Sequence, residues 1–391
     1  MSTKLWTKDF IMVSTTNFFL YFIHYLLIAS MTVFTIEKFH VSTSLSGLAG
    51  GIFIIGMLFG RLYGGKSINK VGWKRMLYIG IIFSLLMILC YFTISSISML
   101  LVIRFLHGIG FGIASTATAT IVSQIIPDKH RGEGTGYYAL STTLASAIGP
   151  FFGIYINHHV NFSANFMICL VLIACSLVCA FLLKVPKVTL PKEIEKGFHL
   201  HSFFEFLALP ISVVCLFVGI AYSSVISYIN SYAQEINLVT VASFFFIVYS
   251  AAILITRPFT GKLFDSKGEN YIVYPILVAF IIGLILLSQA HNGFVLLISA
   301  VFIGIGFGTF LPSAQAIVVK NSPRHRMGLA TSTLYMFADF GTGFGPFLLG
   351  IFIPFIGYRN LYLVMAVIVV FASILYYFVH GKKTKSLVIS K

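Results

Sequence analysis

Twelve long apolar stretches, separated by short polar segments, account for most of the chain. A helix that crosses the hydrocarbon core of a bilayer needs about 20 mostly apolar residues, because every backbone polar group must be satisfied inside the segment. The pattern therefore predicts an all-α integral membrane protein with twelve transmembrane helices. They lie at roughly 10–36, 44–64, 76–95, 99–126, 134–157, 163–184, 209–234, 240–260, 271–290, 293–320, 327–354 and 359–379.

The two sets of six stretches are related by a fixed offset of 196 residues. Gly65 recurs as Gly261 and Gly108 as Gly304, and the Gly-Pro-Phe run at 149–151 recurs at 345–347. Solenoid repeats are much shorter, about 20 to 50 residues, so the offset indicates a duplicated half-protein. We expect two pseudo-symmetric six-helix bundles, 1–184 and 207–391, joined by a cytoplasmic linker at 185–206.

Composition and charge agree with a membrane location. Only 9% of the residues are charged, against about 25% in a typical soluble domain. Of the 26 Lys and Arg residues, 23 fall on the side of the predicted spans that holds both termini. Lys38 and Arg359 fall on the other side, and Arg104 lies within a span. Positive loops stay in the cytoplasm, so we expect a multi-pass cytoplasmic-membrane protein with both termini inside. The net charge of +15 then marks orientation and does not indicate nucleic-acid binding.

The sequence offers little for an enzyme. It has no G-x-x-x-x-G-K-[ST] phosphate-binding loop, no nucleophile–base pair and no metal-ligand cluster. We therefore expect no ATP drive, no cofactor, no metal and no catalytic residues.

Two loops carry a family signature. The sequences GKSINKVGWKR at 65–75 and GKLFDSKG at 261–268 resemble the G-x-L-a-D-r-x-G-r-k loop of the major facilitator superfamily, whose members consist of two parallel repeats. The resemblance covers essentially the whole chain and implies a secondary transporter working by alternating access. The candidate gating residues here are Arg61, Gly65, Asn69, Arg257, Gly261 and Asp265. An acid at this position can sit at the N-terminus of a neighbouring helix as a releasable latch, whereas Asn69 has no charge.

The fifth span carries a second signature. Its segment ASAIGPFFG at 145–153 resembles the antiporter-associated G-x-x-x-G-P-x-x-G-G motif, and GTGFGP at 341–346 is a closer copy of the core. Gly149, Pro150, Gly345 and Pro346 are predicted to form either a kinked, tightly packed interface between the halves or a hinge. Within the family, this motif favours export.

Two charged residues inside spans are candidates for proton coupling. Arg104 precedes a glycine-rich stretch, as in another family signature, although its side chain could instead reach the membrane surface. Asp339 lies near mid-span, about 18 Å from the start of its helix at 1.5 Å per residue. Burial there favours a neutral carboxyl, which either cycles with a proton or only bonds a neighbouring helix. Both positions break the repeat, with Ala300 and Thr143 as their counterparts.

Polar stripes mark the candidate substrate site. The family resemblance implies that spans one, four, seven and ten line a central cavity. The candidates on these spans are Asn17, Tyr21, His24, His107, Ser223, Ser227, Asn230, Gln234 and Gln315. The alternative is that such residues only bridge helices.

Together these features predict a monomeric exporter of a small molecule that exchanges its cargo for protons across the lipid bilayer. The residues Arg104, His24 and His107, with few acids nearby in sequence, favour neutral or anionic cargo. A non-transporting sensor or assembly factor on the same scaffold is the alternative from another class. A lipid or metallophore exporter is an alternative within the transport class.

Overall fold

The computed structural model describes residues 5–41, 43–185, 203–242 and 244–382. The described part of the chain is 90% helical and contains no strand, which confirms the all-α prediction. Most of the predicted linker at 185–206 lies outside the described residues.

Helices follow the twelve predicted stretches closely. Their bounds are α1 Lys8–Phe39, α2 Thr43–Val71, α3 Trp73–Cys90, η1 Tyr91–Thr93, α4 Ile97–Ile125, η2 Asp128–His130, α5 Arg131–His159, α6 Phe162–Leu182, α7 Leu209–Glu235, α8 Val239–Ala242, α9 Phe245–Lys267, α10 Asn270–Ser288, α11 Gly293–Asn321, η4 Arg324–Arg326, α12 Met327–Tyr376 and η5 Tyr377–Gly381.

The last two predicted spans run together as α12, which has 50 residues. At 1.5 Å per residue an unbroken helix of that length would be about 75 Å long, more than twice the hydrocarbon thickness. Gly357 interrupts it with φ 70° and ψ 169°, a backbone conformation that glycine adopts without the penalty a Cβ atom brings. The chain therefore has two helical segments here, as the sequence predicts.

Nine helical segments in the described residues are long and apolar enough to cross a membrane on length and composition alone. The helix α2, the helix α5 and the first part of α12 are not among them. The twelve-helix architecture is consistent with all of these segments.

Contacts divide the chain into two compact units. Unit 1 contains the described residues of 1–127, 138–205 and 322–333, and unit 2 contains those of 128–137, 206–321 and 334–391. The units follow the two sequence repeats except at two short segments. The beginning of α5 belongs to unit 2, and the beginning of α12 belongs to unit 1.

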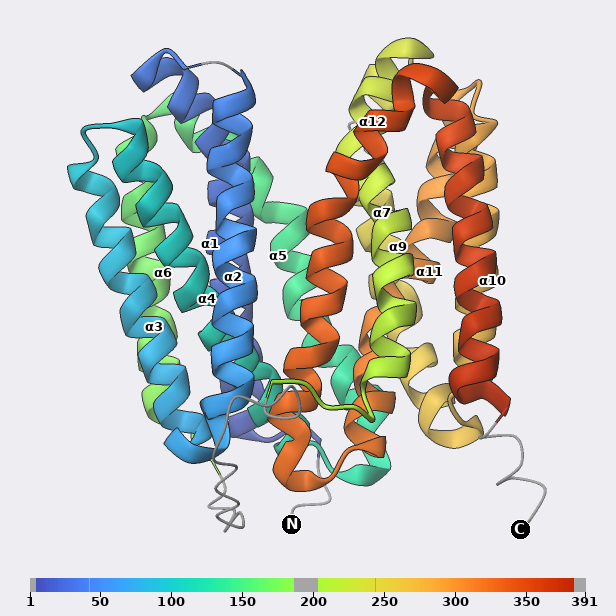
Figure 1. The fold of residues 1–391 in the computed structure, drawn as a ribbon, viewed down its shortest axis with the longest axis horizontal. Helices are drawn as coiled ribbons and strands as arrows, with labels where there is room; N and C mark the ends of the chain where they lie inside the picture. Colours follow the sequence, from blue (N-terminus) through green and yellow to red (C-terminus); the bar gives the residue numbers. More distant parts are fainter. Residues whose placement is uncertain (1–4, 42, 186–202, 243, 383–391) are drawn as a thin grey trace. The chain divides into compact units, whose positions relative to one another are not determined.

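In unit 1, α4 packs against α1, α2 and α3, while α6 packs against α1 and α3 (Figure 1). The contact between α2 and α4 is very close. A Cβ atom built on Gly56 would lie 2.0 Å from the carbonyl oxygen of Phe105, and one on Gly108 would lie 2.1 Å from that of Phe53. Small residues allow this approach, so the prediction that the repeated glycines serve helix packing is confirmed here.

Unit 2 repeats the arrangement with α11 packed against α7, α9 and α10. Gly304, the counterpart of Gly108, faces the carbonyl oxygen of Tyr249, 2.6 Å from a Cβ atom built on it. The opposing glycine is not repeated, because Ala252 stands where Gly56 stands in the first repeat. The two units thus share a packing scheme, with the closest approach in unit 1.

The α2–α4 contact predicts the effect of a single methyl group. We expect Gly108→Ala to lower the free energy of unfolding by about 1–3 kcal/mol, because the helices must move apart to accommodate Cβ. Thermal denaturation of the detergent-purified protein measures this loss. Gly51→Ala is the control, since nothing lies within 4 Å of a Cβ atom at that position of α2. Equal stability of the two variants would contradict the packing argument.

Candidate functional site

Asn17 lies at the centre of a polar network inside unit 1. Its side-chain amide donates to the hydroxyl oxygens of Ser141 (2.8 Å) and Thr142 (3.0 Å). Its carbonyl oxygen accepts from Tyr138 (2.8 Å) and Thr118 (3.2 Å). Asn17 is buried, and these four bonds use its two donors and both lone pairs. The arrangement ties α1, α4 and α5 together, so a direct role for Asn17 in substrate binding stays a prediction.

Two other predicted residues of unit 1, His24 and His107, lie near Arg104. The ring of His24 stacks on Phe53 with centroids 4.8 Å apart, and the guanidinium of Arg104 lies 4.6 Å from the centroid of the same ring. The Nδ1 atom of His107 is 2.9 Å from the hydroxyl of Tyr91. We call Arg104, His24, Phe53, Tyr91 and His107 the Arg104 cluster. The structure thus brings together three residues that the sequence singled out on α1 and α4.

The predicted gating arginines are both buried. Tyr21 accepts a long hydrogen bond from Nη2 of Arg61 (3.4 Å), and the carbonyl of Arg61 accepts from Ser332 (2.6 Å). A Cβ atom on Gly65 would lie 2.5 Å from the Cβ of Ser332. Ser332 belongs to the beginning of α12, which is part of unit 1. Residues from the second repeat therefore complete the surroundings of the first loop.

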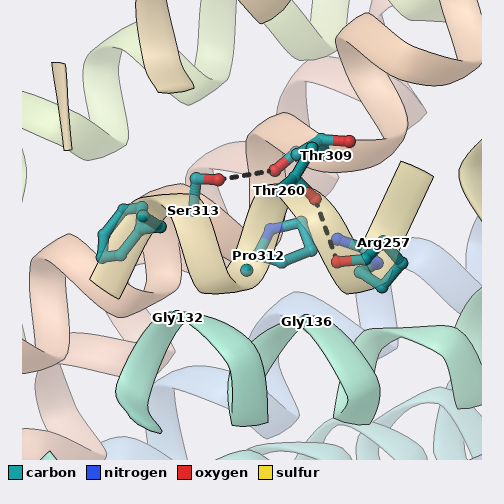
Figure 2. Close-up of a pocket in the computed structure, with 9 residues that line it drawn as sticks. Gly132, Gly136, Arg257, Thr260, Thr309, Pro312 and Ser313 are labelled. Carbon is teal, nitrogen blue, oxygen red and sulfur yellow. Dashed lines mark hydrogen bonds between the residues drawn. The ribbon is translucent and has the colours of Figure 1, made fainter. Parts of the chain in front are cut away.

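Arg257, the counterpart of Arg61, borders a small pocket in unit 2. Figure 2 shows the side chains contributed by α9 and α11 next to two glycines of α5. The pocket is lined by Gly132, Gly136, Arg257, Thr260, Gly261, Phe264, Thr309, Pro312 and Ser313. Nη2 of Arg257 donates to the carbonyl of Gly308 (3.0 Å). A Cβ atom on Gly136 would lie 3.0 Å from Cδ of Arg257, so this glycine leaves room for the arginine.

Asp265 holds the N-terminus of α5. Its two carboxylate oxygens accept from the backbone N–H groups of Gly132 (2.7 Å) and Glu133 (2.9 Å). The first N–H groups of a helix have no partner within the helix and carry a partial positive charge. The predicted position of Asp265 at a helix N-terminus is therefore confirmed, while its use as a latch stays a prediction.

In the first repeat, the uncharged side chain of Asn69 makes the corresponding contact. Asn69 donates its amide to the carbonyl of His325 and accepts from the indole of Trp73 (3.3 Å). His325 lies in η4, just before α12. Asn69 lies in the last turn of α2 and Asp265 in the last turn of α9, so the two segments predicted as loops are largely helical. Asn69 contacts the chain leading into a helix, as Asp265 does, but through an amide and a carbonyl.

The glycines of the antiporter-like motif face helices of their own unit. A Cβ atom on Gly149 would lie 2.8 Å from Cβ of Tyr25 in α1, and one on Gly345 would lie 2.2 Å from the hydroxyl of Ser223 in α7. These glycines serve close packing of α5 on α1 and of α12 on α7, while the role of the motif as an interface or hinge between the halves stays a prediction. Both helices continue through Pro150 and Pro346.

The remaining predicted residues lie in unit 2. Asp339 is half-buried on α12, next to Ala338, whose carbonyl oxygen is 3.1 Å from a Cβ atom built on Gly219 of α7. Gln315 is buried and accepts from Tyr335 (2.9 Å).

The polar residues predicted to share one face of α7 differ in their exposure. Ser223 is buried, whereas Ser227 and Gln234 are exposed. The side chain of Asn230 lies outside what the structure describes.

Sequence reasoning missed a buried ionic cluster in unit 2. The carboxylate of Glu269 accepts from Nζ of Lys320 (2.7 Å) and contacts Nε2 of His380. Burial on its own would raise the pKa of Glu269, but hydrogen bonds and charges from His380 and Lys320 outweigh it and lower the pKa. The three residues stand next to the ends of different helices, and no spacing in the sequence relates them. The only hint in the sequence is that each of the three residues stands near the end of a predicted span.

Two repeated bundles with polar groups buried among apolar helices define a multi-pass membrane protein of the transporter type. The chain belongs to the Major Facilitator Superfamily, whose profile matches residues 13–308 and 240–390. The predicted family is thereby confirmed. Proteins of this family carry small molecules across the cell membrane and are transporters, not enzymes.

Known relatives agree with this assignment. The chain is 25% identical over 346 residues to proteins named multidrug resistance protein MdtG from Salmonella schwarzengrund (strain CVM19633) and Salmonella typhimurium (strain LT2), covering 85% of each chain.

Solved structures share the fold. The human organic anion transporter MFSD10 (TETRAN) has a TM-score of 0.75 at 14% identity and covers 94% of this chain and 98% of that chain. The transporter FucP in the outward conformation has a TM-score of 0.76 at 16% identity, with coverages of 95% and 98%.

The Glu269 cluster predicts a pH-dependent contribution to stability. We expect Glu269→Gln to lower the free energy of unfolding by about 1–3 kcal/mol, because charged hydrogen bonds to Lys320 and His380 are lost. The folded-state pKa of Glu269 lies below the ordinary value of about 4.3. Its contribution is therefore complete above about pH 4.3 and is lost as the pH falls through the folded-state pKa.

Thermal denaturation of the purified protein at several pH values checks this expectation. Glu235→Gln is the matched control, because Glu235 is exposed. The cluster has no such role if both variants lose the same stability, or if the Glu269→Gln difference disappears already at pH 6.

Proposed function

We propose that this protein is a secondary active transporter that exports a small molecule across the cytoplasmic membrane by alternating access, in exchange for protons. Family membership and the names of the MdtG relatives support the transporter class and the direction. The observation that carries the mechanism is the contact of Asp265 with the beginning of α5. It joins the last turn of α9, in the second repeat, to a helix of the first, on the side predicted to be cytoplasmic.

Alternating access requires contacts between the repeats that can form and break. Two charge-assisted hydrogen bonds to a helix N-terminus suit this purpose, because each contributes only about 1.5–3 kcal/mol in net terms. The glycines at this contact allow close approach, since a Cβ atom on Gly261 would lie 2.7 Å from Cα of Glu133. The contact is thus strong enough to hold one state and weak enough to be released.

We assign the proton-carrying role to Asp339. It lies within a membrane span, half-buried, beside the close contact of α12 with α7 at Gly219. Adding or removing a proton there changes the charge of a group next to a helix–helix contact. The first repeat has Thr143 at the equivalent position, which cannot carry a proton in this way. The coupling role predicted for Arg104 stays a prediction.

Proteoliposomes with a trapped pH-sensitive dye test this function. The probes are three compounds that share a naphthalene ring: naphthalene-2-sulfonate, 2-naphthylmethanol and (2-naphthylmethyl)trimethylammonium. We expect at least one to cause proton movement above that of protein-free liposomes, and we expect Asp339→Asn to abolish this movement. Glu37→Gln is the control, since Glu37 is exposed near the end of α1.

Two results would contradict the proposal. Transport of a probe without any proton movement would remove proton exchange from the mechanism. Unchanged proton movement in Asp339→Asn would remove this carboxyl from the coupling.

The Asp265 contact predicts a local change in hydrogen exchange. In Asp265→Asn the acceptor loses its charge, so we expect the backbone N–H groups of Gly132 and Glu133 to exchange about tenfold faster, equivalent to about 1.4 kcal/mol. Mass spectrometry of a peptide covering 128–140 measures this rate. Asn69→Ala removes the contact of the first repeat and should leave the peptide unchanged. If Asp265→Asn also leaves it unchanged, the carboxylate does not hold α5.

A further inference from the structure

Arg104 is a buried cation with little around it to balance its charge. The residue is 0% exposed, and its Nε donates to the carbonyl of Ala49 (3.0 Å). Among the described residues, its two terminal nitrogens have no acceptor in hydrogen-bonding geometry. The hydroxyl of Tyr91 interacts with the guanidinium, but this group is neutral. A charge removed from water is costly unless it is paired and hydrogen-bonded.

The acids in the described part of unit 1 are engaged or placed elsewhere. Asp9 accepts from the backbone N–H of Lys184 (2.8 Å), and Glu205 pairs with Arg326. Glu37 is exposed in the last turns of α1. None of these carboxylates contacts Arg104. The protein therefore keeps the positive charge without a resident counter-ion in this part of the structure.

Aromatic rings surround this charge. Phe53 and Phe111 are buried, with centroids 5.4 Å apart, and the ring of His24 lies 5.3 Å from that of Phe111. Nδ1 of His24 is also buried without a hydrogen-bond partner among the described residues. A cation with two open donors, aromatic surfaces and an additional ring nitrogen suits one chemical class, which is an anionic group carried on an aromatic or apolar body.

We infer that the Arg104 cluster binds the anionic group of an organic anion, a carboxylate or sulfonate, and packs its apolar part against Phe53, Phe111 and His24. The two terminal nitrogens of Arg104 donate to the oxygens of the anion. Protein atoms cover the guanidinium fully in this conformation, so the anion enters by displacing one of the covering rings. As a statement about cargo, this inference rests on the proposed transport function. As a statement about binding, it does not.

The repeat supports a role beyond construction of the bundle. The position equivalent to Arg104 is Ala300, which is buried in α11 against the same set of neighbouring helices. Unit 2 thus builds the corresponding packing without a cation. The positive charge of Arg104 is therefore not required for the packing of this fold.

Equilibrium dialysis of the detergent-purified protein against naphthalene-2-sulfonate tests the inference without requiring transport. We expect the wild type to bind this anion at least tenfold more tightly than 2-naphthylmethanol, which has the same ring and no charge. We expect Arg104→Gln to weaken anion binding by about 10- to 100-fold, the range of a charge-assisted contact, with no change for the alcohol. Arg104→Lys should fall between, because it keeps the charge and loses the planar pair of donors.

The matched control is Arg359→Gln. Arg359 also donates to a backbone carbonyl, that of Ala290 (3.4 Å), but it is exposed. This variant should bind the anion as the wild type does. If Arg104→Gln does not fold, the comparison of the three probes on the wild type, together with Arg104→Lys, still decides the question.

The inference is overturned if Arg104→Gln keeps the wild-type affinity for the anion. It is also overturned if the wild type binds the alcohol or the trimethylammonium probe as tightly as the sulfonate, or does not bind the sulfonate. Anion binding that depends on Arg104, without proton movement in proteoliposomes, would reject the proposed exchange and leave the anion site standing. Proton movement driven only by the cationic probe would support the proposed exchange and reject an organic anion as the cargo.

Discussion

The structure depends on one constraint, that a backbone inside hydrocarbon must satisfy its own hydrogen-bonding groups. Helices meet it within each segment, which explains a chain made almost entirely of helices. The same surroundings remove the hydrophobic driving force between helices, so association relies on close van der Waals packing. Glycine supplies that closeness where Gly56 and Gly108 of α2 and α4 face each other's backbone. Polar networks such as that of Asn17 then fix which helices meet.

In the duplicated architecture, the repeated positions and the positions that differ have distinct roles. Positions that repeat, such as Arg61 with Arg257 and Gly108 with Gly304, are buried in the packed helices of both units. Positions that differ carry the unusual charges. Asp339 and Arg104 have neutral counterparts, and Asp265 corresponds to the uncharged Asn69. The repeat therefore keeps the two bundles alike in packing and leaves them unlike in charge.

Much of the fold could be predicted from the sequence, because span length, hydropathy and the repeat are local or periodic signals. The contact of Asp265 with a helix N-terminus also followed from the signature GKLFDSKG around it. Contacts set by three-dimensional neighbours could not be predicted. The partners of Asn17 lie more than a hundred residues away, and Glu269 meets His380 from another helix. The glycines at 149 and 345 indicated close contacts, but nothing in the sequence identified α1 and α7 as the partner helices. No signal in the sequence indicated that the beginning of α5 belongs to unit 2 or that the beginning of α12 belongs to unit 1.

The glycine contact between α2 and α4 also limits how this protein can change over generations. Any substitution at Gly56 or Gly108 adds at least one carbon atom where a carbonyl oxygen of the opposing helix stands. This face therefore leaves no room for a larger side chain. In unit 2, Ala252 stands where Gly56 stands in unit 1, so the helix opposite Gly304 accepts a side chain at this position and the contact is less restricted there.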